Sequence, residues 1–266
     1  MNRRSFVRSS LGVPLAAAAG RMELDAAQQK GAAREYYVLR RYHLTNGAQR
    51  SLTDPYLKNA LVPGLNRLGI KPVGVFSVTI GPQSPATYVL LPSASLETLA
   101  MADLRLWDDQ EYRKAGDDFL KIPAKDPAYV RVESSLMAAF EGKPTLVVPP
   151  VTADHGERLF ELRTYESATD QDHRRKVEMF HSGEFDIFQR AGFWQVFYGD
   201  TLIGPNLPNL TYMIGFKNMA DRDAKWKAFF TDPQWVKLSH SEKFSFEAIV
   251  SNVTNYVLTP AAFSQI

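Results

Sequence analysis

The sequence contains no cysteine in its 266 residues. This absence excludes disulfides, thiolate metal sites, iron–sulfur clusters and cysteine nucleophiles. An excess of one charge is also missing, because 31 Lys and Arg balance 29 Asp and Glu and no run of five basic residues occurs. We therefore expect no nucleic-acid partner. A hydrophobic share of 45% and a charged share of 23% are typical of a globular chain with one large domain or two small ones.

Acidic residues are absent before Glu23, where Arg3 and Arg4 precede Phe6 and a short, weakly apolar stretch ends in Ala17-Ala18-Ala19. Such a stretch is too short to cross a hydrocarbon core of about 30 Å, so we expect no stable membrane span. Residues 1–20 resemble a twin-arginine signal peptide, which implies a twin-arginine translocase as partner during export and a periplasmic or secreted location. An Arg-rich organellar presequence is the alternative. Residues 21–34 are predicted to form a flexible tether.

The rest of the chain is an internal tandem repeat. Four pairs of segments match at one offset of 123 positions: Tyr37-Val38-Leu39-Arg40-Arg41-Tyr42 with Phe160-Glu161-Leu162-Arg163-Thr164-Tyr165, Gly69 with Gly192, Ile80-Gly81-Pro82 with Ile203-Gly204-Pro205, and Asp109-Gln110-Glu111-Tyr112 with Asp232-Pro233-Gln234-Trp235. We predict a first repeat over residues 35–141 and a second over 157–266. A linker rich in proline and glycine, residues 142–156, joins them.

Both repeats show the same order of predicted elements. Alternating, aromatic-rich segments at 35–43 and 158–166 predict first strands. Helical spacing follows each of them, and Gly69 and Gly192 stand where left-handed C-terminal caps belong. Further strands are predicted at 73–80, 87–91 and near 131–139 in the first repeat, and at 193–203, 210–216 and within 244–258 in the second, with a second helical region in each. This β-α-β-β-α-β order is the ferredoxin-like pattern of an α+β fold.

The second repeat resembles the NIPSNAP domain in its first strand, in Gly192-Phe193-Trp194-Gln195-Val196, in the turn at Gly204-Pro205 and in Asp232-Pro233-Gln234-Trp235. The first repeat is a degenerate copy, with Val38 in place of the acidic residue and Tyr112 in place of the tryptophan. The resemblance implies a dimeric α/β barrel, made here by two fused repeats. Barrels of this kind include cofactor-free oxygenases, isomerases and haem enzymes, so the fold alone does not select a function.

Alternation places Glu161, Arg163 and Tyr165 on one face of their strand. We expect this face to line the inside of the barrel, together with Arg40 and Tyr42 from the first repeat. Guanidinium and phenol groups in one cavity suit an anionic or enol-like ligand. The alternative is a structural network in which Glu161 neutralises Arg163.

Aromatic side chains of the second repeat offer a further ligand contact. Trp194, on the second strand of that repeat, can stack on a planar ligand, although aromatics at strand spacing are more often part of a core. The predicted ligand-binding residues are therefore Arg40, Tyr42, Arg163, Tyr165 and Trp194.

Metal and haem sites have weak support. His181 and Glu184 are three apart and share a helix face, but His173 lies eight residues earlier, about 80° round the helix. The other histidines, His43, His155 and His240, occur singly. A haem would need one of them as its axial ligand. We expect no metal and no cofactor.

The sequence therefore predicts an exported protein that binds a small anionic or aromatic molecule in the barrel between its two repeats. One alternative is a cofactor-independent oxygenase or isomerase in which Tyr165 or Glu161 handles a proton. A perturbed Glu161 in a water-poor cavity would favour this alternative, whereas a neutralised, fully bonded Glu161 would argue against it. Another alternative is a structural oligomerisation module, and pairing of edge strands would give a homo-oligomer.

Overall fold

The computed structural model describes residues 34–45 and 47–266, except for the side chains of residues 246 and 247. The predicted signal peptide, and the predicted tether apart from Arg34, lie outside the described residues. Residues Arg34–Ile266 form one compact unit. No helix among the described residues is long and apolar enough to span a membrane.

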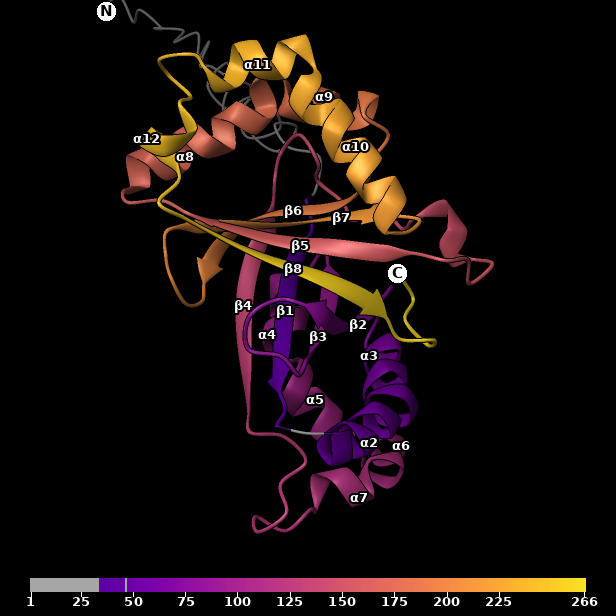
Figure 1. The fold of residues 1–266 in the computed structure, drawn as a ribbon. Coiled ribbons are helices and arrows are strands. Elements are labelled where there is room, and N and C mark those ends of the chain that lie inside the picture. Colours follow the sequence, from indigo (N-terminus) through magenta and orange to yellow (C-terminus); the bar gives the residue numbers. More distant parts are fainter. Residues whose placement is uncertain (1–33, 46) are drawn as a thin grey trace, which may run out of the picture. The chain divides into compact units, whose positions relative to one another are not determined.

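Eight antiparallel strands close into a barrel (Figure 1). They are β1 (Tyr36–His43), β2 (Gly74–Ile80), β3 (Ala86–Ser93), β4 (Arg131–Ala139), β5 (Leu159–Glu166), β6 (Trp194–Ile203), β7 (Asn209–Phe216) and β8 (Asn252–Pro260). Their order around the barrel is β1-β3-β2-β8-β5-β7-β6-β4.

Each repeat supplies one four-stranded sheet, β4-β1-β3-β2 from the first and β8-β5-β7-β6 from the second. Two seams, β4 with β6 and β2 with β8, join the sheets. The predicted tandem ferredoxin-like repeats and their fused α/β barrel are thereby confirmed. The seams pair β4 with β6 over Leu136–Ala139 and β2 with β8 over Val257–Pro260, so closure pairs only part of these strand edges.

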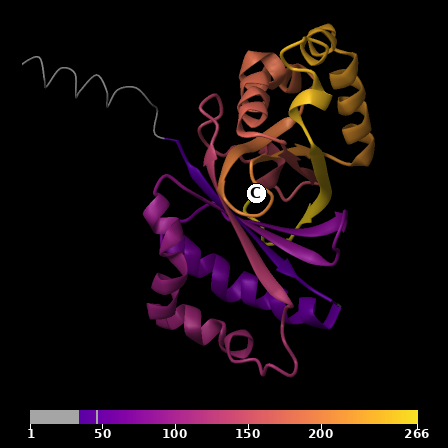
Figure 2. The same cartoon turned by 90° about the vertical axis from the view of Figure 1, so that its left-hand side faces the viewer.

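The helices of the two repeats cover opposite sides of the barrel (Figures 1 and 2). The first repeat has α2 (Gly47–Tyr56), η1 (Leu57–Leu61), α3 (Val62–Arg67), α4 (Leu96–Ala100), α5 (Ala102–Asp108), α6 (Gln110–Ala115) and α7 (Asp117–Leu120). The second has α8 (Asp170–Met179), η3 (Phe180–Glu184), α9 (Phe185–Arg190), α10 (Met219–Thr231), α11 (Pro233–Ser239) and α12 (Phe246–Ile249), and the linker holds a short turn, η2 (Pro150–Thr152).

The two glycines at the ends of α3 and α9 adopt the predicted left-handed conformation. Gly69 and Gly192 each have a φ of 80°. The residue after each glycine bonds back to the helix: Ile70 N donates to Leu65 O, and Phe193 N donates to Phe188 O. Each glycine therefore ends a helix and turns the chain into the next strand, as the sequence predicts.

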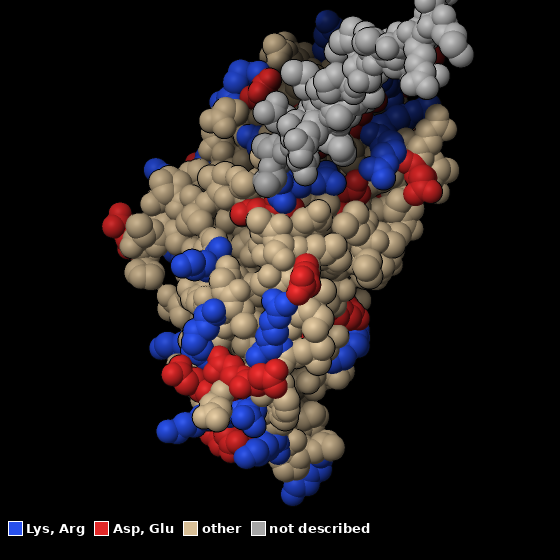
Figure 3. Space-filling view, turned by 180° about the vertical axis from the view of Figure 1, so that it is seen from behind, with Lys and Arg blue, Asp and Glu red and all other residues tan. Residues whose placement is uncertain are grey.

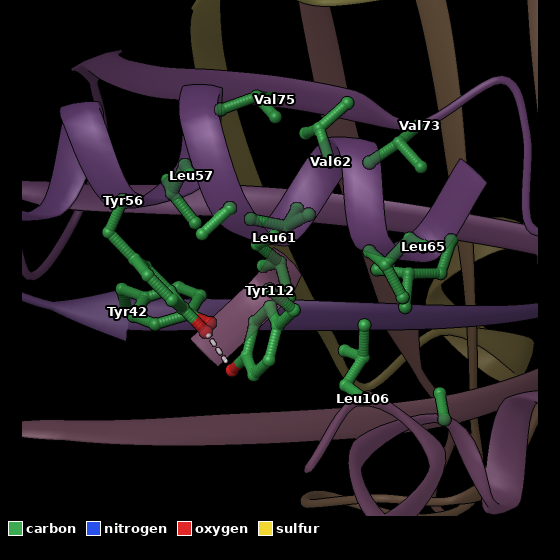
Figure 4. Close-up of a cluster of buried hydrophobic side chains, with 14 of the residues drawn as sticks. Tyr42, Tyr56, Leu57, Leu61, Val62, Leu65, Val73, Val75, Leu106 and Tyr112 are labelled. Atoms are coloured by element: carbon green, nitrogen blue, oxygen red, sulfur yellow. Dashed lines mark hydrogen bonds between the residues drawn. The ribbon is translucent and has the colours of Figure 1, made fainter. Parts of the chain in front are cut away.

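Three apolar cores stabilise the structure. One fills the barrel, and one lies between the sheet and the helices of each repeat. In the first repeat, leucines and valines from η1, α3 and β2 pack around Tyr56 and Tyr112, whose hydroxyl oxygens are 2.8 Å apart (Figure 4). Because cores lie on both sides of the sheets, strand residues on either face become buried.

Candidate functional site

The predicted charged cluster lies on the helix-facing side of the sheet, which corrects the expectation that it lines the barrel. Phe160 and Leu162 belong to the core inside the barrel, whereas Tyr165 belongs to the core under the helices of the second repeat. Tyr42 belongs to the corresponding core of the first repeat. The two arginine–tyrosine pairs therefore lie on opposite sides of the barrel and do not meet. Alternation identifies which residues share a face, but both faces are buried here, so it does not identify the layer.

Arg40 and Tyr42 are part of a filled core. Arg40 Nη1 forms an ion pair with Asp103 on α5 at 2.8 Å. Burial raises the pKa of Tyr42 to about 12, against the opposing effect of Arg40. Leu57 and Leu61 occupy the space above β1 and are almost completely buried. Arg40 and Tyr42, two of the predicted ligand-binding residues, therefore lie within the packed core of the first repeat.

Trp194 lies at the start of β6, opposite Gly215 on β7. The ammonium nitrogen of Lys225 is 5.1 Å from the centre of its ring. Trp194 does not line either of the two cavities described below. The structure therefore separates this predicted residue from Arg163 and Tyr165.

A cavity of about 200 Å³ lies between the sheet and the helices of the second repeat. Its polar groups come from β5, β7 and η3, and its aromatic wall comes from α9, α10 and α11. The lining residues are Arg163, Tyr165, Glu184, Phe188, Tyr212, Trp226, Phe229, Phe230 and Trp235. Two of the predicted residues, Arg163 and Tyr165, are thus brought together in one cavity.

Arg163 and two tyrosines form the hydrogen-bonded floor of this cavity. Arg163 donates from Nε and Nη2 to the Tyr165 hydroxyl at 3.2 and 3.1 Å, and the Tyr165 and Tyr212 hydroxyl oxygens are 2.9 Å apart. The Arg163 guanidinium also lies 4.8 Å from the centre of the Trp226 ring. Burial acts to lower the pKa of Arg163, but the surrounding phenols and Glu161 raise it overall, so the group stays charged.

Glu161 is completely buried and has several hydrogen-bond donors around its carboxylate. Trp226 Nε1 and Arg163 Nη1 donate to Oε2 at 3.0 and 3.4 Å, and Asn255 Nδ2 donates to Oε1 at 3.4 Å, where Arg222 also pairs. This is the fully bonded arrangement that argues against Glu161 as a proton acceptor. The structure supports the alternative in which Glu161 neutralises Arg163.

Lys176 and Glu184 form a buried ion pair at the edge of the cavity. Lys176 Nζ is 2.7 Å from Glu184 Oε2, and the two side chains are 0% and 2% exposed. The ammonium also lies 4.5 Å from the centre of the Phe180 ring. Burial raises the pKa of Glu184, and the nearby Lys176 charge opposes this effect. Sequence reasoning considered Glu184 only as a metal ligand and did not single out Lys176.

The three residues considered for a metal point to different partners. His173 Nε2 is 2.7 Å from Asp200 Oδ1, and His181 Nδ1 is 2.9 Å from the Val177 carbonyl oxygen. Glu184 is held by Lys176. Within residues 34–45 and 47–266, no cluster of three histidine, aspartate or glutamate side chains is placed to hold a metal ion.

A second, smaller cavity of about 120 Å³ opens into the barrel between the two repeats. Arg41 enters it between the rings of Tyr88 and Tyr256, with its guanidinium carbon 5.5 and 5.2 Å from their centres. It donates to the Tyr256 hydroxyl at 3.1 Å and to the carbonyl oxygens of Pro82 and Gln83. These bonds hold the Arg41 guanidinium against the barrel wall, so these donors already have partners in the protein. The larger cavity of the second repeat is therefore the stronger candidate site.

The charged side chains on the surface are of mixed sign. Figure 3 shows acidic and basic groups interspersed on one face of the molecule. This arrangement agrees with the balanced composition of the chain and gives no single-sign field for a polyanion.

The fold and the cavity define a fused α/β barrel with one candidate site beneath the helices of its second repeat. Residues 37–124 and 160–265, more than half of the chain, match the NIPSNAP family. The chain therefore belongs to the NIPSNAP family. A comparison with curated proteins gave no match.

Solved structures resemble the chain over one or both repeats. A protein of Lactobacillus acidophilus NCFM, named as a candidate monooxygenase, aligns with a TM-score of 0.56 and 9% identity over 85% of this chain and 94% of that chain. A NIPSNAP-like domain protein of Burkholderia xenovorans aligns with a TM-score of 0.37 and 20% identity over 41% of this chain and 90% of that chain. A NIPSNAP family protein of Agrobacterium tumefaciens strain C58 aligns with a TM-score of 0.35 and 17% identity over 40% and 90%.

Proposed function

We propose that this protein binds a small planar molecule with an acidic or anionic oxygen in the cavity of its second repeat. The observation that carries this proposal is the buried guanidinium of Arg163 beside an aromatic wall. Arginine has five N–H donors. The three bonds from Arg163 to Tyr165 and Glu161 use three of them, which leaves two to meet an oxygen of the ligand.

The size and lining of the cavity limit the class of ligand. An apolar cavity of about 150 Å³ is large enough to bind benzene. The cavity beside Arg163 measures about 200 Å³, so it fits a molecule with one ring or two fused rings. The Trp235 ring provides a surface on which such a molecule can pack, whereas the Trp226 ring already contacts the Arg163 guanidinium and stacks with Phe230.

The first repeat keeps the arginine and one tyrosine of this site but differs at four other positions. At the offset of 123 positions, Thr53, Leu61, Val89 and Asp103 stand in place of Lys176, Glu184, Tyr212 and Trp226. Apolar side chains from η1 and β3 fill the corresponding space beneath the helices. We assign binding to the second repeat and a structural role to the first.

A second candidate function is that of an oxygenase or isomerase that uses no bound cofactor. The observation that favours it is a buried carboxylate, Glu184, in the same cavity as Arg163 and Tyr165, since a desolvated carboxylate is suited to proton transfer. A binding protein returns its ligand unchanged, whereas an enzyme releases a molecule of different mass.

The test of binding compares two equivalent arginines. Native mass spectrometry of the protein from its own host should show extra mass that is lost on denaturation. We expect Arg163→Ala to lose this mass, because the ligand loses its charged partner, and Arg40→Ala to keep it. Retention of the extra mass by Arg163→Ala would contradict the proposed site, and loss in both variants would indicate a general effect on the fold.

We also propose that the chain is exported by the twin-arginine translocase and cleaved after Ala19. The support is the sequence of residues 1–20, with its arginine pair and the four alanines at 16–19. The expected result is a mature protein that begins at Gly20, and accumulation of the uncleaved form when Arg3 and Arg4 are both replaced by Lys. A wild-type protein that keeps residues 1–19 would contradict this proposal.

A further inference from the structure

We propose that the ligand enters the cavity as a neutral phenol or enol and gives its hydroxyl proton to Glu184. This inference rests on the proposed binding function and names the chemical class of the ligand. Among the described residues, the hydrogen bond to the Glu184 carboxylate comes from Lys176 and goes to Oε2, which leaves Oε1 without a bond from the protein. Since Glu184 lines the cavity, this oxygen is the acceptor available to a ligand.

The helix geometry explains how Lys176 and Glu184 come to face the cavity together. Eight residues along a regular α-helix leave two side chains about 80° apart. The helix is not regular between them, because η3 (Phe180–Glu184) is kinked at Gly183, and the regular offset therefore does not apply. Gly183 has a φ of 138° within this turn, a conformation that suits glycine. The same turn therefore builds the ion pair and directs the carboxylate into the site.

The charges around the cavity favour a ligand that arrives neutral. Arg163 is balanced by Glu161, and Lys176 by Glu184. Arg222, which also pairs with Glu161, is balanced by Asp223 at the surface. A permanent anion would add an uncompensated charge to a buried site, which is costly. A neutral hydroxyl adds no net charge to the buried site when it binds. Transfer of its proton to Glu184 does not change that net charge either.

The transfer is complete without an oxidant or another reactant. The O–H bond of the ligand breaks, and its electron pair stays on the ligand oxygen. The proton forms a new O–H bond at Glu184 Oε1, while Lys176 keeps its own proton. The negative charge moves from Glu184 to the ligand, where Arg163 is the charged partner.

The experiment uses 4-nitrophenol as the probe, because its neutral and ionised forms absorb at different wavelengths. Quenching of tryptophan fluorescence measures binding, since Trp226 and Trp235 line the cavity. Absorbance measures ionisation, at a pH one unit below the pKa of the free probe. We expect the wild-type protein to bind the probe in its ionised form. The ratio of ionised to neutral probe should be at least ten times higher for bound probe than for free probe. Glu184→Gln should bind the probe in its neutral form.

A second variant controls for misfolding of Glu184→Gln. Glu184→Gln leaves the Lys176 ammonium buried without a charged partner, which is destabilising. The double variant Lys176→Thr with Glu184→Leu copies Thr53 and Leu61, the residues with which the first repeat folds at the same positions. This variant should also bind the probe without ionising it.

The outcomes separate the two proposals. Binding of neutral probe by the wild-type protein would overturn the proton transfer and leave the binding function in place. The same ionised spectrum in the wild type and both variants would also overturn it, because Arg163 alone would then be sufficient. If the probe quenches nothing in the wild type, the proposed binding function itself fails, and this inference fails with it.

Discussion

Equivalent residues in the two repeats have different surroundings, and this difference locates the site. Arg40 and Arg163 are related by the repeat, yet Arg40 reaches Asp103 beneath packed leucines, whereas Arg163 faces a cavity. The sequence predicts the arginine–tyrosine pairs of both repeats. It does not predict which pair faces a cavity, because that depends on side chains of other elements, such as Leu61 in one repeat and Glu184 in the other.

Asp200 on β6 gives a prediction for the pH dependence of stability. Burial acts to raise the pKa of Asp200, but hydrogen bonds from His173 at 2.7 Å and Arg174 at 2.9 Å lower it overall. A pKa below the unfolded value of about 3.9 means that the folded state binds fewer protons than the unfolded state. The stabilisation is present above about pH 4 and is lost as the pH falls through the folded pKa.

Urea unfolding of the wild type and Asp200→Asn at pH 7, 5 and 3 tests this expectation. The wild type should be more stable at pH 7 by about 1.5–3 kcal/mol, the range for a hydrogen bond to a charged group. The difference between the two proteins should shrink between pH 5 and pH 3. A difference that stays constant over this range would contradict the assignment to Asp200.

At the level of elements, the repeated Asp-x-x-aromatic motif is a helix cap. Asp232 accepts hydrogen bonds from the backbone N–H of Gln234 at 2.7 Å and of Trp235 at 3.4 Å, and Arg190 donates to the same carboxylate. Asp109 caps α6 in the same way and is bound by Arg67. The motif therefore fixes the start of α6 and α11, and in the second repeat it positions Trp235 at the cavity.

Replacing Asp232 by Ala should lower the free energy of unfolding by about 1 kcal/mol, the usual effect of losing an N-cap. Ligand binding should weaken as well, because α11 carries Trp235 into the wall of the cavity. Asp109→Ala is the control: it should lower stability to a similar extent and leave binding unchanged. Urea unfolding and probe titration measure the two effects, and equal loss of binding in both variants would refute this role of the cap.

β5 and η3 differ most from what the sequence predicts. Alternation correctly grouped Glu161, Arg163 and Tyr165, but their placement inside the barrel was wrong because the strand is buried on both faces. The ion pair of Lys176 and Glu184 was missed because a spacing of eight does not share a face in a regular helix. Local pattern thus predicts strands, caps and topology, whereas the helix kink at Gly183 that brings the pair together cannot be calculated from residue spacing.

At the scale of the whole molecule, barrel closure makes each repeat depend on the other. The seams β4–β6 and β2–β8 are the strand pairs that join them. Residues 157–266 alone would expose the free edges of β6 and β8, and unpaired strand edges tend to pair with other chains. Two copies of the second repeat can satisfy both edges by forming the barrel between themselves. We therefore expect the isolated second repeat to be a homodimer.

Sedimentation equilibrium of residues 157–266 measures the mass of the assembled species directly. The expected result is twice the mass of the fragment, with a thermal midpoint that rises with protein concentration, because assembly stabilises the folded state by mass action. The full chain should show a midpoint independent of concentration, since its two sheets are already joined covalently. A stable monomeric fragment would mean that the second repeat, with its cavity, folds without the barrel, and that the first repeat is not needed to hold the site together.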